Sequence, residues 1–324
     1  MSSADNRPPV FVTRRLPDAV EDRLKRDYRP ILNTDDHLPS ADEVVEGCRE
    51  AEALVPCPTD RITSDVIRRL ADGVKVIASF SVGYEHIDID AAARRGIVVT
   101  NTPDVLTDAT ADIALLLILG AARRVHEGQR MIYEKTWGAW APTAMRGVHV
   151  TGARLGILGM GRIGQALARR VAGFGMEVHY HNRSRLTGEL EAGARFHDSL
   201  DSLLAVSDIL SIHCPSTPET LRIINEESLR LLPDGAIVVN TARGNVVDDD
   251  ALIAALSCGK LFSAGLDVFD GEPDIHPGYR DLDNIFLLPH LGSATMPTRD
   301  AMGFRALDNL DAFFAGQEPP DRVA

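Results

Sequence analysis

Short runs of β-branched and other apolar residues alternate along this chain with longer stretches whose apolar positions recur at the helical period. This alternation is typical of βαβ units, in which helices join neighbouring strands of a parallel sheet. It occurs in two consecutive series. The pattern therefore predicts an α/β protein with two Rossmann-like domains, the first flavodoxin-like and the second doubly wound.

The apolar runs also give the positions of the expected strands. Five strands in the first series suit a flavodoxin-like sheet, with a helix expected at Ser64–Ala71, and six strands in the second suit a Rossmann sheet. The first series is expected at Val10–Thr13, Pro30–Asn33, Ala53–Pro56, Lys75–Phe80 and Ile97–Thr100. The second is expected at Arg154–Leu158, Glu177–His181, Ile209–His213, Ala236–Asn240, Ser263–Asp267 and Ile285–Leu288.

Two long helices complete the predicted pattern. One is expected over Thr107–Glu134, with acidic residues early and basic residues late, as the helix dipole favours. Its solid apolar run, Ile113–Ala122, implies burial on most sides but is too short to span a membrane. The other is expected over Met296–Phe314 and, because it lacks strand partners of its own, is expected to pack on the first domain.

Length and charge narrow the function. At 324 residues the chain suits two domains, given roughly 150 residues per domain. Its net charge of −13 repels nucleic acid and anionic lipid, so we expect neither as a partner. An anionic cofactor or acid substrate would need a local cationic pocket, which draws attention to arginines within motifs.

The cysteines suggest a compartment. Their spacing matches neither paired metal ligands nor a disulfide scaffold, so we expect a reducing cytoplasm and no metal site. The four are Cys48, Cys57, Cys214 and Cys258.

A glycine-rich segment follows the first strand of the second series. Gly159, Gly161 and Gly164 form a Gly-x-Gly-x-x-Gly pattern between an apolar strand and a helical stretch, the context that a dinucleotide-binding loop requires. The first glycine allows a tight turn, the second lets backbone approach the pyrophosphate, and the third permits close helix packing. We therefore predict a dinucleotide cofactor.

The end of the next strand bears on which dinucleotide is used. NAD enzymes of this type carry an acid there, about 20 residues on, for the ribose hydroxyl. This chain has His181-Asn182-Arg183-Ser184-Arg185 instead. Two guanidinium groups with Ser184 and Asn182 suit a 2′-phosphate, so we predict NADP(H) in preference to NAD(H). The alternative is that both arginines are solvated loop residues.

Three ionisable residues follow later strands of the second series. Arg243, Glu272 and His290 each come after a predicted strand, where parallel sheets bind ligands. Carbonyl reduction by hydride needs a proton for the developing alkoxide and a cation for the acid group, and a carboxylate beside the imidazole favours its protonated form. The set predicts an oxidoreductase acting on a small 2-oxo or 2-hydroxy acid.

These residues resemble the D-isomer-specific 2-hydroxyacid dehydrogenases, particularly their glyoxylate and hydroxypyruvate reductase branch. The resemblance covers nearly the whole chain, since several motifs occur in the family's order. They are Ser81-Val82-Gly83-Tyr84-Glu85-His86-Ile87-Asp88, Asn101-Thr102-Pro103, Leu158-Gly159-Met160-Gly161-Arg162-Ile163-Gly164, Asn240-Thr241-Ala242-Arg243-Gly244, Leu266-Asp267-Val268-Phe269, Gly271-Glu272-Pro273 and Pro289-His290-Leu291-Gly292-Ser293-Ala294-Thr295.

The resemblance implies roles for the reactive residues. His290 is the implied acid/base, Glu272 its partner, and Arg243 the clamp on the substrate carboxylate and carbonyl. Backbone N–H groups of Val82 and Gly83 are implied to bind the substrate carboxylate from the first domain. The reactive site is then expected in an interdomain cleft.

The resemblance also implies a division of labour between domains. Residues 1–100 and 290–324 are expected to form the substrate-binding domain, and residues 101–289 the dinucleotide-binding domain. Beyond the glycine loop and the segment Asn182 to Arg185, the implied cofactor-binding residues are Thr110, Arg162, Ile163, His213, Cys214, Pro215, Thr241, Ala242, Asp267 and Gly292.

A tryptophan-bearing segment suggests a partner. Trp137-Gly138-Ala139-Trp140-Ala141-Pro142 is similar to the aromatic loop that, in the hydroxypyruvate-reducing branch, reaches the other subunit's substrate pocket. That implies a homodimer, whereas local packing of both tryptophans is the alternative.

The sequence therefore predicts NADPH-dependent reduction of glyoxylate or hydroxypyruvate to glycolate or D-glycerate, with His290 as proton donor. Two alternatives stay open. One is a reductase of the same family for another, phenylpyruvate-like 2-oxo acid. The other is a non-catalytic, nucleotide-sensing scaffold similar to corepressors.

Overall fold

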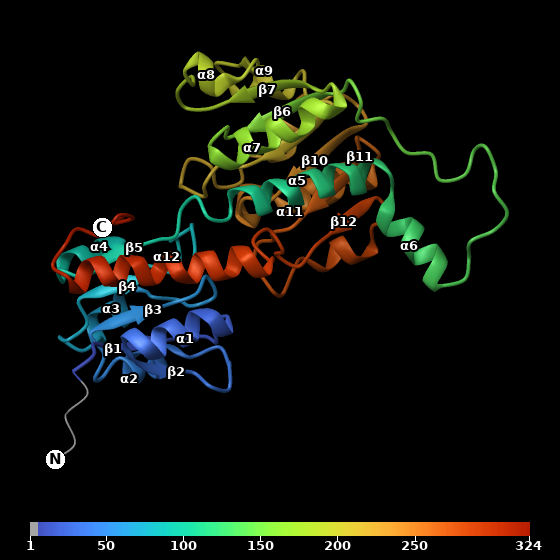
Figure 1. The fold of residues 1–324 in the computed structure, drawn as a ribbon. Coiled ribbons are helices and arrows are strands. Elements are labelled where there is room, and N and C mark those ends of the chain that lie inside the picture. The colour runs from blue at the N-terminus through green and yellow to red at the C-terminus, as the bar shows by residue number, and fades with distance from the viewer. Residues whose placement is uncertain (1–5) are drawn as a thin grey trace. The chain divides into compact units, whose positions relative to one another are not determined.

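The computed structural model describes residues 6–324, which form two compact units (Figure 1). Unit 1 comprises the chain up to Leu106 together with Thr295–Ala324, and unit 2 comprises Thr107–Ala294. This division assigns residues 101–106 to unit 1 and residues 290–294 to unit 2. Within residues 6–324, no helix combines the length and apolar character needed to cross a membrane.

Unit 1 contains a five-stranded parallel sheet in the order β2-β1-β3-β4-β5, which confirms the predicted flavodoxin-like arrangement. Its strands are β1 (Pro9–Val12), β2 (Arg29–Leu32), β3 (Ala53–Val55), β4 (Val76–Ala78) and β5 (Val98–Thr100). Its helices are α1 (Asp18–Asp27), α2 (Ala41–Gly47), α3 (Ser64–Arg69), α4 (Ile89–Arg94) and α12 (Met296–Phe314).

Alternation along β1 fixes the two faces of this sheet. Val10 and Val12 belong to the core that packs against α1 and α12, whereas Phe11 belongs to the core on the other face, with residues of α2, α3 and α4. Successive side chains of a strand point to opposite faces, so each helix layer buries its own set. Leu307 of α12 is fully buried in this unit, and burial of such a side chain stabilises by about 2 kcal/mol.

Unit 2 contains a seven-stranded parallel sheet in the order β12-β11-β10-β9-β6-β7-β8. The six strands expected from the sequence are present, and the two-residue β8 at the edge was missed because so short a run has no detectable period. The strands are β6 (Arg154–Leu158), β7 (Glu177–His181), β8 (Arg195–Phe196), β9 (Ile209–Ile212), β10 (Ala236–Asn240), β11 (Leu261–Leu266) and β12 (Ile285–Leu287).

The helices of unit 2 cover both faces of this sheet, as expected for a doubly wound fold (Figure 1). They are α5 (Thr107–Ala122), α6 (Val125–Tyr133), α7 (Arg162–Val171), α8 (Gly188–Glu191), α9 (Leu200–Leu204), α10 (Glu226–Leu231) and α11 (Asp249–Ser257). Short 3₁₀ turns occur at Ala172–Phe174, Gly244–Val246 and Pro277–Asp281.

The single helix predicted over Thr107–Glu134 is wrong, because the structure has two helices there, α5 and α6. Arg124 between them adopts a left-handed conformation with φ of 54°. The backbone N–H of Val148 donates to the carbonyl of Ala122 at 3.0 Å, which satisfies a terminal carbonyl of α5. The break therefore depends on a segment more than twenty residues downstream.

Candidate active site

The glycine loop joins β6 to α7 at the point where the strand order of unit 2 changes direction. Gly159 has φ of 92°, and a Cβ there would lie 2.6 Å from the backbone N of Cys214. A Cβ on Gly164 would lie 2.8 Å from the carbonyl oxygen of Gly159. Both positions therefore require glycine, for the turn and for close packing of the helix on the strand.

The beginning of α7 fits a pyrophosphate. Its N-cap residue, Gly161, has no side chain to accept hydrogen bonds from the first turn, and a Cβ built there would meet no atom within 4 Å. An uncapped helix N-terminus offers N–H groups and the positive end of the dipole to an anion. Arg162 and Ile163 form the first turn of this helix. The residues present thus fit the dinucleotide that the sequence predicts.

The segment after β7 contains the residues expected to select the cofactor. The Oδ1 atom of Asn182 accepts a hydrogen bond at 2.6 Å from the backbone N of Met160, so this side chain holds the glycine loop. Arg183 and Ser184 are exposed. Arg185 forms an ion pair with Glu191 of α8, at 2.7 Å. Asn182 and Arg185 are therefore already bound to other groups of the protein, whereas Arg183 and Ser184 are exposed.

Arg243 follows β10 and is held by its neighbours. The amide of Asn240, the last residue of β10, donates to the carbonyl of Arg243 at 2.9 Å and accepts from the backbone N of Ala242 at 2.9 Å. A Cβ on Gly244 would lie 1.8 Å from the carbonyl carbon of Phe269, so this loop packs directly against the one carrying Glu272. The sequence analysis missed Asn240, although a polar residue that ends an apolar strand was a visible signal.

Glu272 and His290 form a hydrogen-bonded pair. The Nδ1 atom of His290 lies 2.7 Å from Oε2 of Glu272, while Oε1 of Glu272 accepts from the backbone N of Phe269 at 2.8 Å. Burial by itself raises the pKa of Glu272, but the hydrogen bond and charge of His290, with contributions from Phe269 and Arg243, outweigh burial and lower that pKa. The carboxylate therefore stays ionised beside the imidazole.

The backbone of His290 is strained, and Asp267 binds the backbone of the two residues that follow His290. Its φ of 55° lies in the left-handed region, which non-glycine residues seldom adopt. Asp267 is fully buried, and its carboxylate accepts from the backbone N of Leu291 at 2.6 Å and of Gly292 at 2.7 Å. Burial raises the pKa of the Asp267 carboxyl group, and this effect outweighs the lowering of that pKa by the two backbone hydrogen bonds. Thr110 donates to the carbonyl of Gly292 at 3.1 Å, so α5 supports the same turn.

His213 follows β9 and is enclosed by hydroxyl groups. Its Nε2 lies 2.8 Å from Oγ of Ser211, and its Nδ1 lies 3.3 Å from Oγ1 of Thr241. Burial lowers the pKa of His213 to about 4, so the ring is neutral at pH 7. Cys214 next to it is buried, and Pro215 follows with its carbonyl accepting from Thr220 at 2.7 Å.

Unit 2 thus brings together all the predicted residues except Val82 and Gly83, which belong to unit 1. The carbonyl oxygens of both residues accept hydrogen bonds from side chains of unit 1. Ser81 Oγ donates to that of Gly83 at 2.6 Å, and Asn101 Nδ2 donates to that of Val82 at 2.7 Å. Among residues 6–324, no protein acceptor is hydrogen-bonded to the backbone N–H of Val82 or Gly83. These two donors remain for an anionic group.

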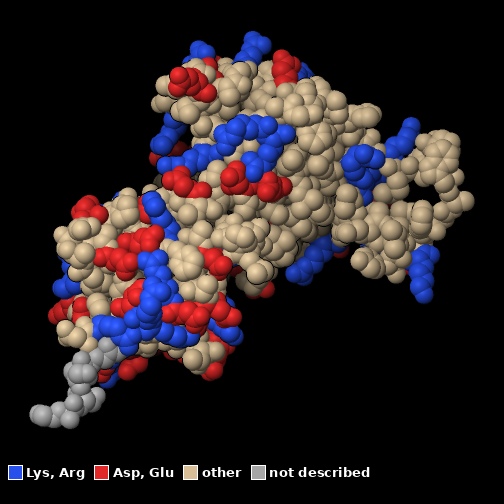
Figure 2. Space-filling view, in the orientation of Figure 1, with Lys and Arg blue, Asp and Glu red and all other residues tan. Residues whose placement is uncertain are grey.

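Charged side chains over α7 contrast with the acidic chain as a whole. Figure 2 shows basic side chains gathered over this helix of unit 2, with acidic ones beside them. Arg170 of α7 pairs with Asp108 at 2.9 Å and with Asp112 at 2.6 Å. Arg170 lies in the last turn of α7, so its charge is balanced by these two carboxylates and lies away from the dinucleotide loop.

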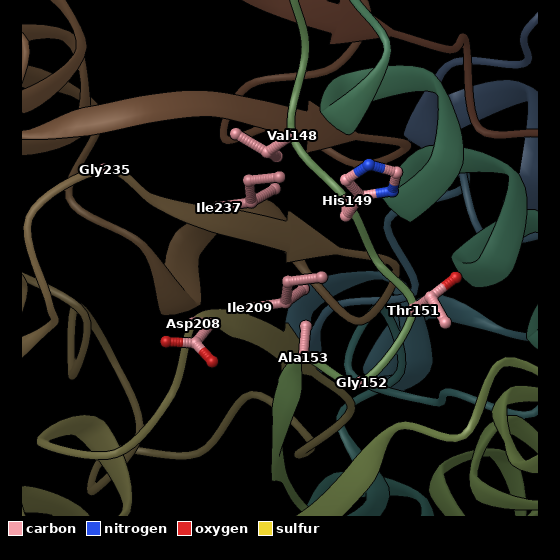
Figure 3. A pocket seen from close by; sticks show the side chains of 9 residues that line it. All are labelled: Val148, His149, Thr151, Gly152, Ala153, Asp208, Ile209, Gly235 and Ile237. Atoms are coloured by element: carbon pink, nitrogen blue, oxygen red, sulfur yellow. The ribbon is translucent and has the colours of Figure 1, made fainter.

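A cavity of about 310 Å³ lies where the strands of the unit 2 sheet begin, at their amino ends (Figure 3). Its lining includes Ala153, Asp208 and Gly235, which immediately precede β6, β9 and β10. The carboxylate of Asp208 is occupied by Arg154, at 2.6 Å. Because parallel sheets bind ligands at the carboxyl ends of strands, this cavity is separate from the candidate site.

Comparison with known proteins gives the family. Residues 115–292 match the family model described as the D-isomer specific 2-hydroxyacid dehydrogenase, NAD binding domain. The chain is 45% identical over 311 residues to the glycerate dehydrogenase of Hyphomicrobium methylovorum, covering 95% of this chain and 97% of that protein. It is 43% identical over 322 residues to the glyoxylate reductase of Thermococcus litoralis, covering 98% and 97%.

Solved structures agree with this relationship. The NADPH-dependent glyoxylate/hydroxypyruvate reductase of Sinorhizobium meliloti, solved in complex with NADP and malonate, is similar with a TM-score of 0.88 and 32% identity, covering 98% of this chain and 97% of that one. The chain belongs to the D-isomer specific 2-hydroxyacid dehydrogenase family. It is an oxidoreductase of that family, built for a nicotinamide dinucleotide cofactor.

Proposed function

We propose that this enzyme reduces glyoxylate or hydroxypyruvate with NADPH, giving glycolate or D-glycerate. The observation that carries the proposal is the pair formed by His290 and Glu272, 2.7 Å apart, with the loop of Glu272 packed against the one carrying Arg243. The relatives named glycerate dehydrogenase and glyoxylate reductase support the choice of substrate. Unit 2 is the dinucleotide-binding part and unit 1 the substrate-binding part in this proposal.

The residues divide the work of carbonyl reduction. A bound reduced nicotinamide supplies the hydride. Glu272 accepts a hydrogen bond from Nδ1–H of His290, which leaves Nε2 of that ring to hold the proton for the substrate oxygen. The Arg243 guanidinium binds the acid group and polarises the carbonyl, because its planar set of N–H donors fits a carboxylate. In unit 1, the proposal assigns carboxylate binding to the backbone N–H groups of Val82 and Gly83.

Initial rates with four acids and two cofactors test this function. Loss of reduced-nicotinamide absorbance is followed with NADPH and with NADH, using glyoxylate, hydroxypyruvate, pyruvate and phenylpyruvate. The proposal expects the highest kcat/KM with NADPH and glyoxylate or hydroxypyruvate. Preference for phenylpyruvate would favour the other reductase of the family, and cofactor binding without turnover of any acid would favour the nucleotide-sensing scaffold.

The NADPH preference depends on the segment after β7. That segment carries Asn182, not an acid, and an exposed Arg183 beside Ser184. An Asn182→Asp variant keeps an oxygen to accept from the backbone of Met160 but places a carboxylate near the expected 2′-phosphate. We expect the NADPH to NADH ratio of kcat/KM to fall by about 10- to 100-fold, because the added carboxylate repels the negatively charged 2′-phosphate. An unchanged ratio would contradict the phosphate site.

The chain is also proposed to form a homodimer through α6 and the segment that follows it. None of the residues of α6 is buried. Tyr133 is 81% exposed, Trp137 71% and Trp140 84%, a run of large aromatic surface of the kind that marks an interaction site. Sedimentation of the wild type and a Tyr133→Ser/Trp140→Ser variant tests this. Dimeric wild type and a monomeric variant support the proposal, and a monomeric wild type contradicts it.

A further inference from the structure

A buried carboxylate lies beneath the loop that is proposed to select the cofactor. Glu191, the last residue of α8, is 8% exposed. Its Oε1 accepts from Nε of Arg185 at 2.7 Å, and its Oε2 accepts from Nη2 of the same guanidinium at 3.1 Å. Two parallel N–H···O bonds between arginine and carboxylate form the strong, orientation-specific pairing. One edge of the exposed Arg185 guanidinium is therefore already bound to a carboxylate of the protein.

An aromatic residue of β7 extends this network. Tyr180 is fully buried, its hydroxyl donates to Oε1 of Glu191 at 2.7 Å, and the same hydroxyl accepts from the backbone N of Leu186 at 3.0 Å. The Arg185 guanidinium carbon lies 5.9 Å from the centre of the Phe196 ring on β8. Contacts to β7, β8 and α8 thus fix the course of the loop that carries Arg183.

The charges of the pair stabilise each other. The hydrogen bond with Glu191 raises the pKa of Arg185, and the hydrogen bonds from Arg185 and Tyr180 lower the pKa of Glu191. Both groups are ionised at neutral pH. Moving Arg185 to a phosphate would leave the buried carboxylate of Glu191 without its counter-ion, which is costly.

Arg183 is in a different situation. It is exposed, and no hydrogen bond or ion pair to another residue of the described range 6–324 involves its side chain. Its charge helps to lower the pKa of the exposed Glu219, but its guanidinium can turn to a phosphate without breaking a hydrogen bond or salt bridge of residues 6–324. The sequence treats Arg183 and Arg185 as equivalent, and the contacts of the folded chain separate them.

We infer that Arg183 is the guanidinium that selects the 2′-phosphate, and that Arg185 is a positioning residue, held by Glu191, that orders the loop. The inference rests on the proposed NADPH preference and goes beyond it by assigning distinct roles to the two arginines and a role to Glu191. The buried acid acts on the cofactor only through Arg185 and the loop, because its oxygens are bound to Arg185 and Tyr180.

Four variants test this assignment: Arg183→Gln, Arg185→Gln, Glu191→Gln and the Arg185→Gln/Glu191→Gln double variant. Kd values of NADPH and NADH are measured by titration without substrate, and Tm is measured without cofactor. Arg195→Gln is the matched control, because it removes another exposed guanidinium of unit 2.

Arg183→Gln is expected to lower the preference for NADPH over NADH by about 10- to 100-fold, the loss of a charge-assisted contact, with Tm unchanged. Arg185→Gln is expected to weaken both cofactors together, changing the preference less than about 3-fold, and to lower Tm. The double variant should recover part of that Tm, since it no longer buries an unpaired carboxylate. Arg195→Gln should change neither quantity.

Two results would overturn the inference. A loss of NADPH preference in Arg185→Gln as large as in Arg183→Gln would make Arg185 a phosphate ligand, and additive Tm losses in the double variant would remove the positioning role. A wild type that prefers NADH would overturn both the proposed preference and the role of Arg183. Absence of 2-oxo acid turnover would contradict the proposed reaction alone, because the titrations contain no substrate.

Discussion

Units 1 and 2 have parallel sheets of the same kind, yet the helix that follows the glycine loop of unit 2 begins differently from three helices of unit 1. In unit 1, the N-cap residues of α2, α3 and α4 are Ser40, Thr63 and Asp88. Each of these side chains accepts a hydrogen bond from a backbone N–H of the first turn. In unit 2, α7 starts at Gly161, which has no side-chain cap. A capped helix satisfies its own donors, whereas an uncapped one leaves them for an anion. The same fold thus supports stability in one place and binding in another.

The residues that follow the strands also differ between the two units. In unit 1, Thr13 follows β1 and Ser79 follows β4, and both are buried hydroxyl residues with protein partners. In unit 2, His213 directly follows β9, and Arg243 lies three residues after the end of β10. A fold alone does not specify a site, and the residues at strand ends decide whether the edge is inert or reactive.

The largest expected effect comes from removing the reactive group of unit 2. His290→Ala should lower kcat by about 10³-fold or more, since it deletes the proton donor, while leaving the Kd of NADPH within about 3-fold. Glu272→Gln should lose less, because the imidazole remains but its charged partner is gone. Steady-state rates and cofactor titrations measure both. Normal turnover by His290→Ala would remove this residue from the mechanism.

Next in size is a pH effect on stability that depends on His213. Its folded-state pKa of about 4 lies below the ordinary value of about 6.5, so the unfolded chain takes up the proton first as pH falls. Its contribution is therefore full above pH 6.5 and is lost as pH falls toward 4. Between pH 7 and pH 4.5 this loss is on the order of 2 to 3 kcal/mol.

A His213→Gln variant isolates that effect. Glutamine does not titrate, so the fall in the free energy of unfolding from pH 7 to pH 4.5 should be smaller in the variant by the amount given above. Urea denaturation at the two pH values measures it. Equal pH dependence in the two proteins would mean that His213 is not a buried neutral imidazole.

Installing a unit 1 type of helix start in unit 2 should cost cofactor affinity. Gly161→Asp has room for its side chain and should cap α7, yet it places a carboxylate where the pyrophosphate is expected. We expect the Kd of NADPH to rise by about 10- to 100-fold, with Tm unchanged or higher. Gly161→Ser is the matched control, capping without charge, and should lose less. Unaltered affinity in Gly161→Asp would place the pyrophosphate elsewhere.

The smallest effect is expected from the reverse change in unit 1. Ser40 and Glu43 form a reciprocal capping box at the start of α2. Ser40→Ala should lower the free energy of unfolding by about 1 kcal/mol, the usual value of such a cap. The Kd of NADPH should not change. A loss of affinity together with stability would mean that the capped start of α2 also contributes to cofactor binding.

The sequence by itself determined the order of elements and led to the proposed reactive set. Strand periodicity placed β6, β7 and β10 to the residue, and the glycine spacing identified the loop before α7. Arg243, Glu272 and His290 were found because each follows a strand, and parallel strands end at one edge. These features are local, so a short window of residues contains the information.

Only the tertiary structure decided how individual side chains are engaged. The end of α5 depends on Val148, the glycine loop is held by Asn182, and Arg185 is taken by Glu191. Each contact joins segments whose proximity no local period encodes. A side chain's role depends on which partners it contacts in the folded chain. Breaking such a contact is costly where the polar groups are buried.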